Sequence, residues 1–295
     1  MSAAQKLPHD YLISKIDELP TLPTIVYELT QIINDPMSST SDVEKVMAND
    51  QSLTTKVLKL VNSAYYAIPG GVSSLSRAIA YIGFDTVNQL VLSSSIIDAL
   101  EVDFPSDFEI NEFWKHSVGV GIAAETIAKF TKYPMPADLF TCGLIHDMGK
   151  IALLTIDMEL LLEISKFAKD NDLSFNQAEL EIDVITHTQI GKLLSDRWTL
   201  PMQLRAAIAH HHQKDPMKRG GISNDLNKIV DIVYLSNLLV HALKFGNSGH
   251  NHILGAPKDV MQRLTIDPQK DFKPLVKLIK DNLDKASDFI KLICG

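Results

Sequence analysis

The chain has 295 residues, of which 45% are hydrophobic and 22% charged. This balance is typical of a folded globular protein with a sizeable core. The formal net charge of -8 disfavours broad nucleic-acid binding, because such binding depends on cations that neutralise phosphates.

The first hundred residues carry apolar positions at helical spacing, separated by capping and turn residues. The residue before a proline leaves the α region, and Ser or Asp side chains cap helix N-termini, so both mark boundaries. The pattern predicts a helix over 20–34, which ends at Asn34-Asp35-Pro36, and another over 74–82, which ends at Gly83. Three more helices are predicted to begin after 39–42, after Asp50 and after the cap residue Asp85.

The charged, proline-containing stretch 101–107 predicts a boundary between two parts. Strand-like alternation is nearly absent, so we expect an all-α fold of two packed helical lobes, residues 1–105 and 106–295. The second lobe is predicted to contain helices over 110–131, 136–154, 157–171, 175–195, 200–211, 226–245 and 257–293, the last broken near Pro268 and Pro274.

Two features indicate the compartment. Cys142 and Cys294 do not form a disulfide framework, which favours a reducing environment. The first ten residues lack the apolar segment of a signal peptide, and no run of about 18 apolar residues predicts a spanning helix. We expect a cytoplasmic protein with no membrane partner.

The segment Gly143-Leu144-Ile145-His146-Asp147-Met148-Gly149-Lys150 is the strongest chemical signal. Adjacent residues on a helix do not face each other, so a His-Asp pair usually serves a third group. Imidazole nitrogen and carboxylate oxygen together suit first-row divalent ions. The pair therefore indicates a metal ion.

The other histidines allow two interpretations. Bundles build metal sites from ligands on several facing helices, and the candidates lie on different predicted helices. Each residue taken alone is equally well explained as a structural or solvated histidine, or as a helix C-terminal cap for His212. Spacing alone leaves open whether they converge. The candidates are His116, His187, His210, His211 and His212, whereas His250 and His252 lie in a Gly/Asn loop where exposure is expected.

Several separated motifs resemble the HDOD family over about residues 18–240. They are 19–23 (LPTLP), 34–36 (NDP), 50–66 (DQSLTTKVLKLVNSAYY), 72–79 (VSSLSRAI), 82–83 (IG), 196–201 (DRWTLP) and 208–211 (IAHH). HDOD domains are all-helical bacterial signalling modules related to HD-type metal-dependent phosphohydrolases, including the HD-GYP enzymes. The resemblance implies an HD-like helical bundle in the C-terminal lobe.

The resemblance also implies roles for individual residues. Its metal ligands correspond to His116, His146, Asp147, His187, His210 and His211. Lys150 corresponds to the lysine that contacts a substrate phosphate, and is the one candidate catalytic residue. The ion would be divalent, such as Fe, Mn, Ni, Zn or Mg.

Two departures from the hydrolases weaken the prediction of catalysis. The late-helix aspartate ligand is replaced by Asn237, which we expect to point into the site as a weaker, neutral ligand. The Gly-Tyr-Pro motif is absent after His211. With Asp147 as the main carboxylate, we expect at most one tightly held ion, and Asn237→Asp should raise metal occupancy.

Two functions from different classes remain. The first is a signal-transduction adaptor that binds other signalling proteins, with or without a metal ion. The second is a metal-dependent phosphohydrolase acting on a nucleotide or a cyclic dinucleotide. Asn237 and the HDOD motifs favour the adaptor, whereas the histidine set favours the hydrolase or a metal-bound adaptor. No direct nucleic-acid partner is expected.

Overall fold

The computed structural model describes residues 9–19, 21–35, 37–100 and 108–294, and within these ranges the chain is helical with no strand. The all-α prediction is confirmed. The helices are α1 (His9–Ile16), α2 (Thr24–Asn34), α3 (Thr40–Met47), α4 (Gln51–Val61), α5 (Leu75–Ile82), α6 (Phe84–Ala99), α7 (Ile110–Phe130), α8 (Pro136–Leu144), α9 (Met148–Ile156), α10 (Met158–Asp170), α11 (Phe175–Glu181), α12 (His187–Arg197), α13 (Met202–His210), a 3₁₀ turn (Pro216–Lys218), α14 (Asn224–Ala242), α15 (Lys258–Arg263), α16 (Phe272–Asp284) and α17 (Ser287–Cys294).

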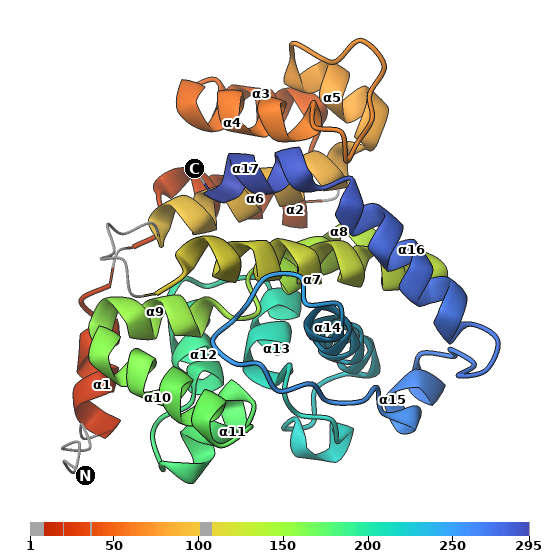
Figure 1. The fold of residues 1–295 in the computed structure, drawn as a ribbon. Coiled ribbons are helices and arrows are strands. Elements are labelled where there is room, and N and C mark those ends of the chain that lie inside the picture. Colours follow the sequence, from red (N-terminus) through yellow and green to blue (C-terminus); the bar gives the residue numbers. More distant parts are fainter. Residues whose placement is uncertain (1–8, 20, 36, 101–107, 295) are drawn as a thin grey trace.

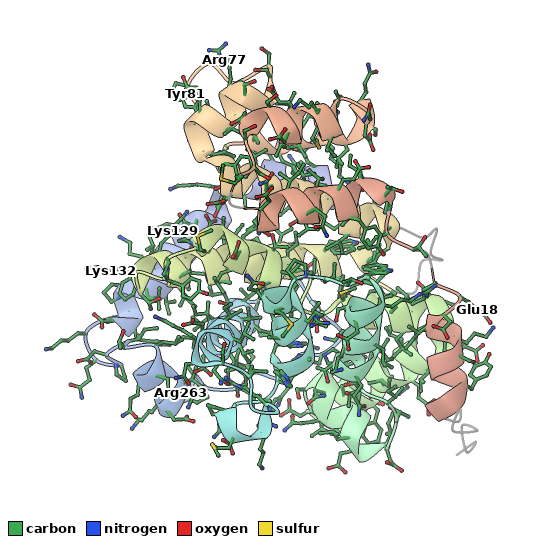
Figure 2. The ribbon with its side chains drawn as sticks, turned by 180° about the vertical axis from the view of Figure 1, so that it is seen from behind. Glu18, Arg77, Tyr81, Lys129, Lys132 and Arg263 are labelled. Atoms are coloured by element: carbon green, nitrogen blue, oxygen red, sulfur yellow. The ribbon has the colours of Figure 1, made fainter. Side chains whose placement is uncertain are left out.

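The long helix α7 lies at the centre of the molecule (Figure 1). It packs against α8, α14, α16 and α17, while α2 to α6 lie above it and α9 to α13 below it. Seen from behind in Figure 2, Arg77 and Tyr81 mark the tip of the upper helices, far from Arg263 on α15. One cluster of buried apolar side chains runs through all of these layers.

Both ends of the described chain pack across this arrangement. α1 contacts α9 and α12 below, although α2 to α6 lie above. α17 contacts α4 as well as α7, and Phe289 lies against the rings of Tyr65, Tyr66 and Phe140. The predicted boundary at 101–107 falls outside the described residues, so the division into 1–105 and 106–295 stays a prediction.

The predicted caps mostly hold. Asp50 accepts a hydrogen bond from the backbone N–H of Leu53 at 2.9 Å, and Ser39, within the predicted 39–42 stretch, is the N-cap residue of α3. The prediction for Asp85 is wrong, because α6 begins at Phe84 directly after Gly83. Gly83 has a φ of 87° and occupies the N-cap position, which leaves Asp85 in the first turn.

Three predicted helices are broken. The 136–154 helix is interrupted at residues 145–147, and the 175–195 helix by a turn in which Asp183 has a φ of 55°. The 257–293 helix is interrupted around Pro268, as predicted, and again at residues 285–286. Pro274 does not break it, because it lies in the first turn of α16, where no backbone N–H is needed.

Among the described residues, one stretch, Pro136–Ile156, is long and apolar enough to cross a membrane by length and composition. However, 89% of its most apolar window is buried inside the protein, as in a core segment. The same stretch is interrupted at residues 145–147, between α8 and α9.

Candidate metal centre

The His146-Asp147 pair lies in the gap between α8 and α9, and glycines on both sides allow close backbone approach. A Cβ at Gly143 would lie 2.7 Å from the carbonyl oxygen of Val120 on α7. A Cβ at Gly149 would lie 1.9 Å from the carbonyl oxygen of His187 on α12, so no side chain fits there. α9 therefore packs directly on α12, which brings Asp147 to His187.

One carboxylate oxygen of Asp147 faces histidines from two other elements. Asp147 Oδ1 lies 3.2 Å from Nε2 of His187, at the start of α12, and 3.3 Å from Nε2 of His211, after α13. His212 Nε2 lies 3.1 Å from His187 Nε2. One ligand atom from each of these residues lies within 4.8 Å of the others. We call Asp147, His187, His211 and His212 the first donor group.

The outer ring nitrogens in this group contact fixed acceptors. His187 Nδ1 donates to Glu179 Oε2 at 2.8 Å, and His211 Nδ1 donates to the carbonyl oxygen of Ile208 at 3.0 Å. In the neutral rings each Nε2 therefore presents a lone pair to the interior. The two Nε2 atoms lie 3.2 Å apart, a distance at which facing lone pairs repel. A cation shared by both nitrogens removes this conflict, so the residues fit a metal ion.

The ionisation states of Asp147 and His211 suit a divalent cation, whereas at His187 the ion would displace a proton. Burial alone would raise the pKa of Asp147, but His146 and Lys150 outweigh it and hold the pKa well below its usual range. Burial lowers the pKa of His211 to about 3. Burial also opposes protonation of His187, but Glu179 and Asp147 outweigh it and raise the pKa. An ionised carboxylate among imidazoles is a donor set that first-row divalent ions prefer.

The other carboxylate oxygen of Asp147 faces a different set. His146 Nε2 lies 3.3 Å from Asp147 Oδ2, and His116 packs against His146 with ring centroids 5.7 Å apart. Asn237 Oδ1 accepts a hydrogen bond from His116 Nε2 at 3.0 Å, so the amide lies beside this set. One ligand atom from each of His116, His146 and Asp147 lies within 4.8 Å of the others. We call His116, His146 and Asp147 the second donor group.

Lys150 is buried beside the second donor group. Its Nζ donates to Asp147 Oδ2 at 2.8 Å, and it approaches the carbonyl and hydroxyl oxygens of Ser248 at 3.1 and 3.3 Å. The ammonium also lies 4.7 Å from the centroid of the Phe175 ring. Lys150 is only 1% exposed. Its charge is therefore directed at Asp147 and the interior, not at a surface pocket.

Residues 246–251, which we call the strap, cover this side of the site between α14 and α15 (Figure 1). The strap is held by the backbone N–H of Asn247, which donates to the carbonyl oxygen of Glu112 at 2.9 Å, and by Ser165, which donates to the carbonyl oxygen of Gly249 at 2.7 Å. The expected exposure of His250 is wrong. It is 6% exposed, and its ring lies 4.2 Å from that of His241.

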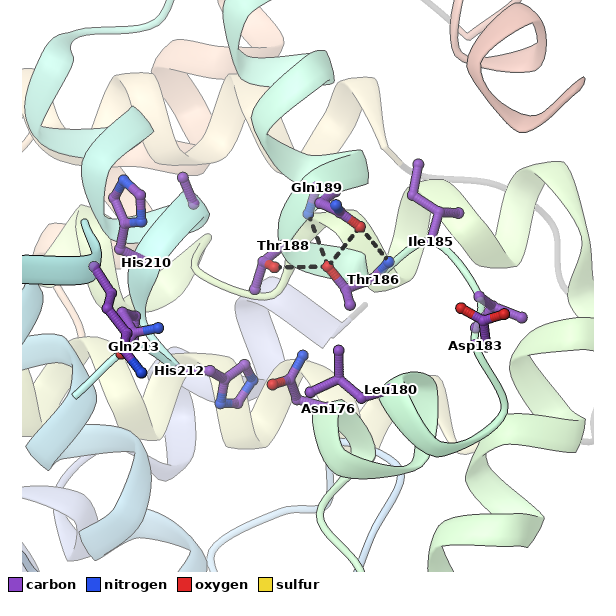
Figure 3. A pocket seen from close by; sticks show the side chains of 13 residues that line it. Asn176, Leu180, Asp183, Ile185, Thr186, Thr188, Gln189, His210, His212 and Gln213 are labelled. Carbon is purple, nitrogen blue, oxygen red and sulfur yellow. Dashed lines mark hydrogen bonds between the residues drawn. The ribbon is translucent and has the colours of Figure 1, made fainter. Parts of the chain in front are cut away.

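His210 does not join either donor group in the described structure. It lines a pocket of about 770 Å³ whose wall also contains His212. The two rings point in different directions (Figure 3). The adjacent pair of histidines at the site is therefore His211 and His212, which follow the end of α13, whereas His210 is the last residue of that helix.

Sequence reasoning missed two contributors and left a third open. Glu179 meets His187 only because the chain turns back between α11 and α12, and no local pattern signals this. His241 follows Asn237 by four residues on α14, and this spacing could have placed both on one face. His241 Nε2 lies 3.3 Å from Ser248 Oγ, next to the strap. The open case was His212, for which a helix cap remained an alternative.

This all-helical architecture, with histidines from several helices gathered around one His-Asp pair, defines an HD-like helical protein. The model of the HDOD domain family matches residues 19–214. The chain therefore belongs to the HDOD family. An uncharacterised protein of Treponema pallidum (strain Nichols) is 27% identical over 202 residues, which are 68% of this chain and 39% of that protein. The match spans about two fifths of the length of that curated relative.

Solved structures share the fold. An HDOD domain protein of unknown function from Geobacter sulfurreducens has a TM-score of 0.74 at 23% identity, covering 96% of each chain. A candidate phosphohydrolase from Shewanella amazonensis SB2B has a TM-score of 0.73 at 21% identity, covering 97% of this chain and 99% of that one. A candidate signal-transduction protein from Marinobacter aquaeolei VT8 has a TM-score of 0.78 at 19% identity, covering 97% of this chain and 65% of that one.

Proposed function

We propose that this HDOD chain is a bacterial cytoplasmic signal-transduction regulator that acts by binding signalling proteins, and that it carries one divalent metal ion. The ion would be held by the first donor group, Asp147, His187, His211 and His212. The observation that carries the proposal is the pair of Nε2 atoms of His187 and His211, 3.2 Å apart, with both outer nitrogens bonded to acceptors. When bound, the ion supplies a Lewis acid and a cross-link between neighbouring elements.

The residues around Asp147 support a regulator more than a hydrolase. Lys150, the residue expected to contact a substrate phosphate, uses its donors on Asp147 and Ser248 and is buried under the strap. Asn237 contributes no charge where the hydrolases have a carboxylate. Catalysis of phosphoryl transfer depends on such charges around the reacting phosphate.

One observation favours the alternative, a metal-dependent phosphohydrolase acting on a nucleotide or cyclic dinucleotide. The pocket of about 770 Å³ reaches the first donor group at His212. Its wall carries hydroxyl and amide side chains that could bind a polar ligand, namely Asn176, Thr186, Thr188, Gln189 and Gln213 (Figure 3). A substrate of this size would have access to the ion.

The test combines metal content with turnover in the purified full chain. We expect one divalent ion per chain by elemental analysis. We also expect no hydrolysis of bis(p-nitrophenyl) phosphate or of a cyclic dinucleotide, with added Mn²⁺, beyond that of the His187→Ala variant. Turnover well above this control would overturn the regulator in favour of the hydrolase. Absence of any metal ion after purification and reconstitution would refute the metal centre in both.

A further inference from the structure

Asp147 is shared by two donor groups that differ in what else contacts the carboxylate. Its Oδ1 faces His187 and His211 at 3.2 and 3.3 Å, and among the described residues no lysine or arginine pairs with that oxygen. Its Oδ2 faces His146 at 3.3 Å but is also bonded to Lys150 Nζ at 2.8 Å. The geometry would offer two cation positions if Lys150 were absent.

The ammonium of Lys150 is fixed in the second donor group by several contacts. It has three N–H donors, and three oxygens lie within hydrogen-bonding distance: one of Asp147 and two of Ser248. The Phe175 ring covers it, and the residue is 1% exposed. A buried ammonium held by these contacts cannot swing into solvent to make room for a metal ion.

The remaining donors of the second group are neutral nitrogens. His116 Nε2 donates to Asn237 Oδ1 and His146 Nδ1 donates to the carbonyl oxygen of Gly143, which leaves buried, unpartnered lone pairs on His116 Nδ1 and His146 Nε2. Asn237 itself is neutral. Asp147 is then the one carboxylate in the second group, and its negative charge is already balanced by Lys150. A divalent ion placed here would meet like charge with too little anionic charge to offset it.

We propose that Lys150 is the internal counter-cation of the second donor group, and that together with Asn237 it restricts this protein to one divalent ion. This rests on the proposed function in one respect, namely that the first donor group holds that ion. Lys150 would then serve as a fixed positive charge where a second metal ion could otherwise bind.

The test is Mn²⁺ binding to the chelator-stripped full chain, measured by equilibrium dialysis with electron paramagnetic resonance. We expect the wild type to bind one Mn²⁺ and Asn237→Asp to bind a second ion only weakly. The double variant Lys150→Met/Asn237→Asp should bind the second ion at least about 100-fold more tightly than Asn237→Asp, with the spectrum of two coupled ions. The matched control, Lys192→Met/Asn237→Asp, removes an exposed ammonium on α12 and should behave like Asn237→Asp.

The outcomes separate the two proposals. Two tightly bound ions in the wild type, or a folded double variant no better than Asn237→Asp, would overturn the role of Lys150 and leave the first ion standing. A wild type that binds no Mn²⁺ overturns both. Circular dichroism checks folding, and Lys150→Gln, whose amide can still donate to Ser248, replaces Lys150→Met if that variant is unfolded. If neither variant folds, the wild-type count decides: one ion supports the proposal and two refute it.

Discussion

The two sides of Asp147 share one carboxylate and yet differ in chemistry. On the Oδ1 side, imidazoles from two elements turn their Nε2 atoms inward because Glu179 and a backbone carbonyl accept from the outer nitrogens. On the Oδ2 side, the ammonium of Lys150 balances the carboxylate and the amide of Asn237 accepts from His116, while His146 Nε2 keeps an unpartnered lone pair. The comparison teaches that the residues behind the ligands, not the ligands alone, decide where a cation fits.

The strongest way to break the comparison is His187→Ala, which removes the ring central to the Oδ1 side. We expect the bound ion to be lost almost completely, because the remaining donors no longer surround one position. Elemental analysis and Mn²⁺ titration measure the loss. The matched control His252→Ala removes a ring that pairs with Asp172 near the surface, and it should leave the ion content unchanged. Retention of the ion in His187→Ala would place the metal elsewhere.

Gly149→Ala tests the close contact on which the Oδ1 side depends. The added Cβ would lie 1.9 Å from the His187 carbonyl oxygen, so α9 and α12 must separate. We expect the free energy of unfolding to fall by about 3 kcal/mol, the upper range for an overpacked core. Urea unfolding measures the change. Gly255→Ala, where a Cβ meets nothing within 4 Å, is the control and should differ little from the wild type. Equal stabilities of the two variants would refute the contact.

Glu179→Gln sharpens the comparison by changing only the group behind His187. The amide keeps the shape but removes the negative charge that, with Asp147, raises the pKa of His187. We expect metal affinity to fall by about 10–100-fold, the usual effect of losing such a partner. Glu181→Gln, an exposed change on the same helix, is the control. Unchanged affinity in Glu179→Gln would mean that the carboxylate is structural only.

The strap side should be sensitive to acid through His250. Burial lowers the pKa of His250 to about 2, with a further contribution from His241. The unfolded chain binds a proton here below about pH 6.5, whereas the folded protein does not. The stabilising effect of the neutral ring is therefore complete above pH 6.5 and is lost as pH falls. The contribution of His250 to the slope is expected to rise toward about 1.4 kcal/mol per pH unit as pH falls from 6.5 to 5.

The His250→Asn variant provides the measurement. Its free energy of unfolding should decline less steeply between pH 6.5 and pH 5 than that of the wild type. His252→Asn, two residues along, is the matched control for the loss of a ring from this loop. Parallel pH profiles for wild type and His250→Asn would contradict the burial argument.

Much of the fold followed from local chemistry. Apolar spacing predicted an all-helical chain, and the capping roles of Asp50 and of Ser39 in the 39–42 stretch were visible as short-range patterns. The breaks at 145–147 and 182–186 were not visible, because the flanking apolar residues continue at helical spacing. At both breaks the tertiary contacts of α9 with α12 outweigh the local preference for a continuous helix.

By itself, the sequence determined the donor types: a carboxylate and imidazoles at His146, Asp147, His187 and His211, with glycines that permit close backbone contact. Only the tertiary structure decided which side each donor faces. It placed His212 rather than His210 beside His187, set Glu179 behind that ring, and directed Lys150 onto Asp147 under the strap, where Ser248 is buried. The physical reason is that helical periodicity specifies a face of one helix, whereas convergence depends on turns and packing between distant segments.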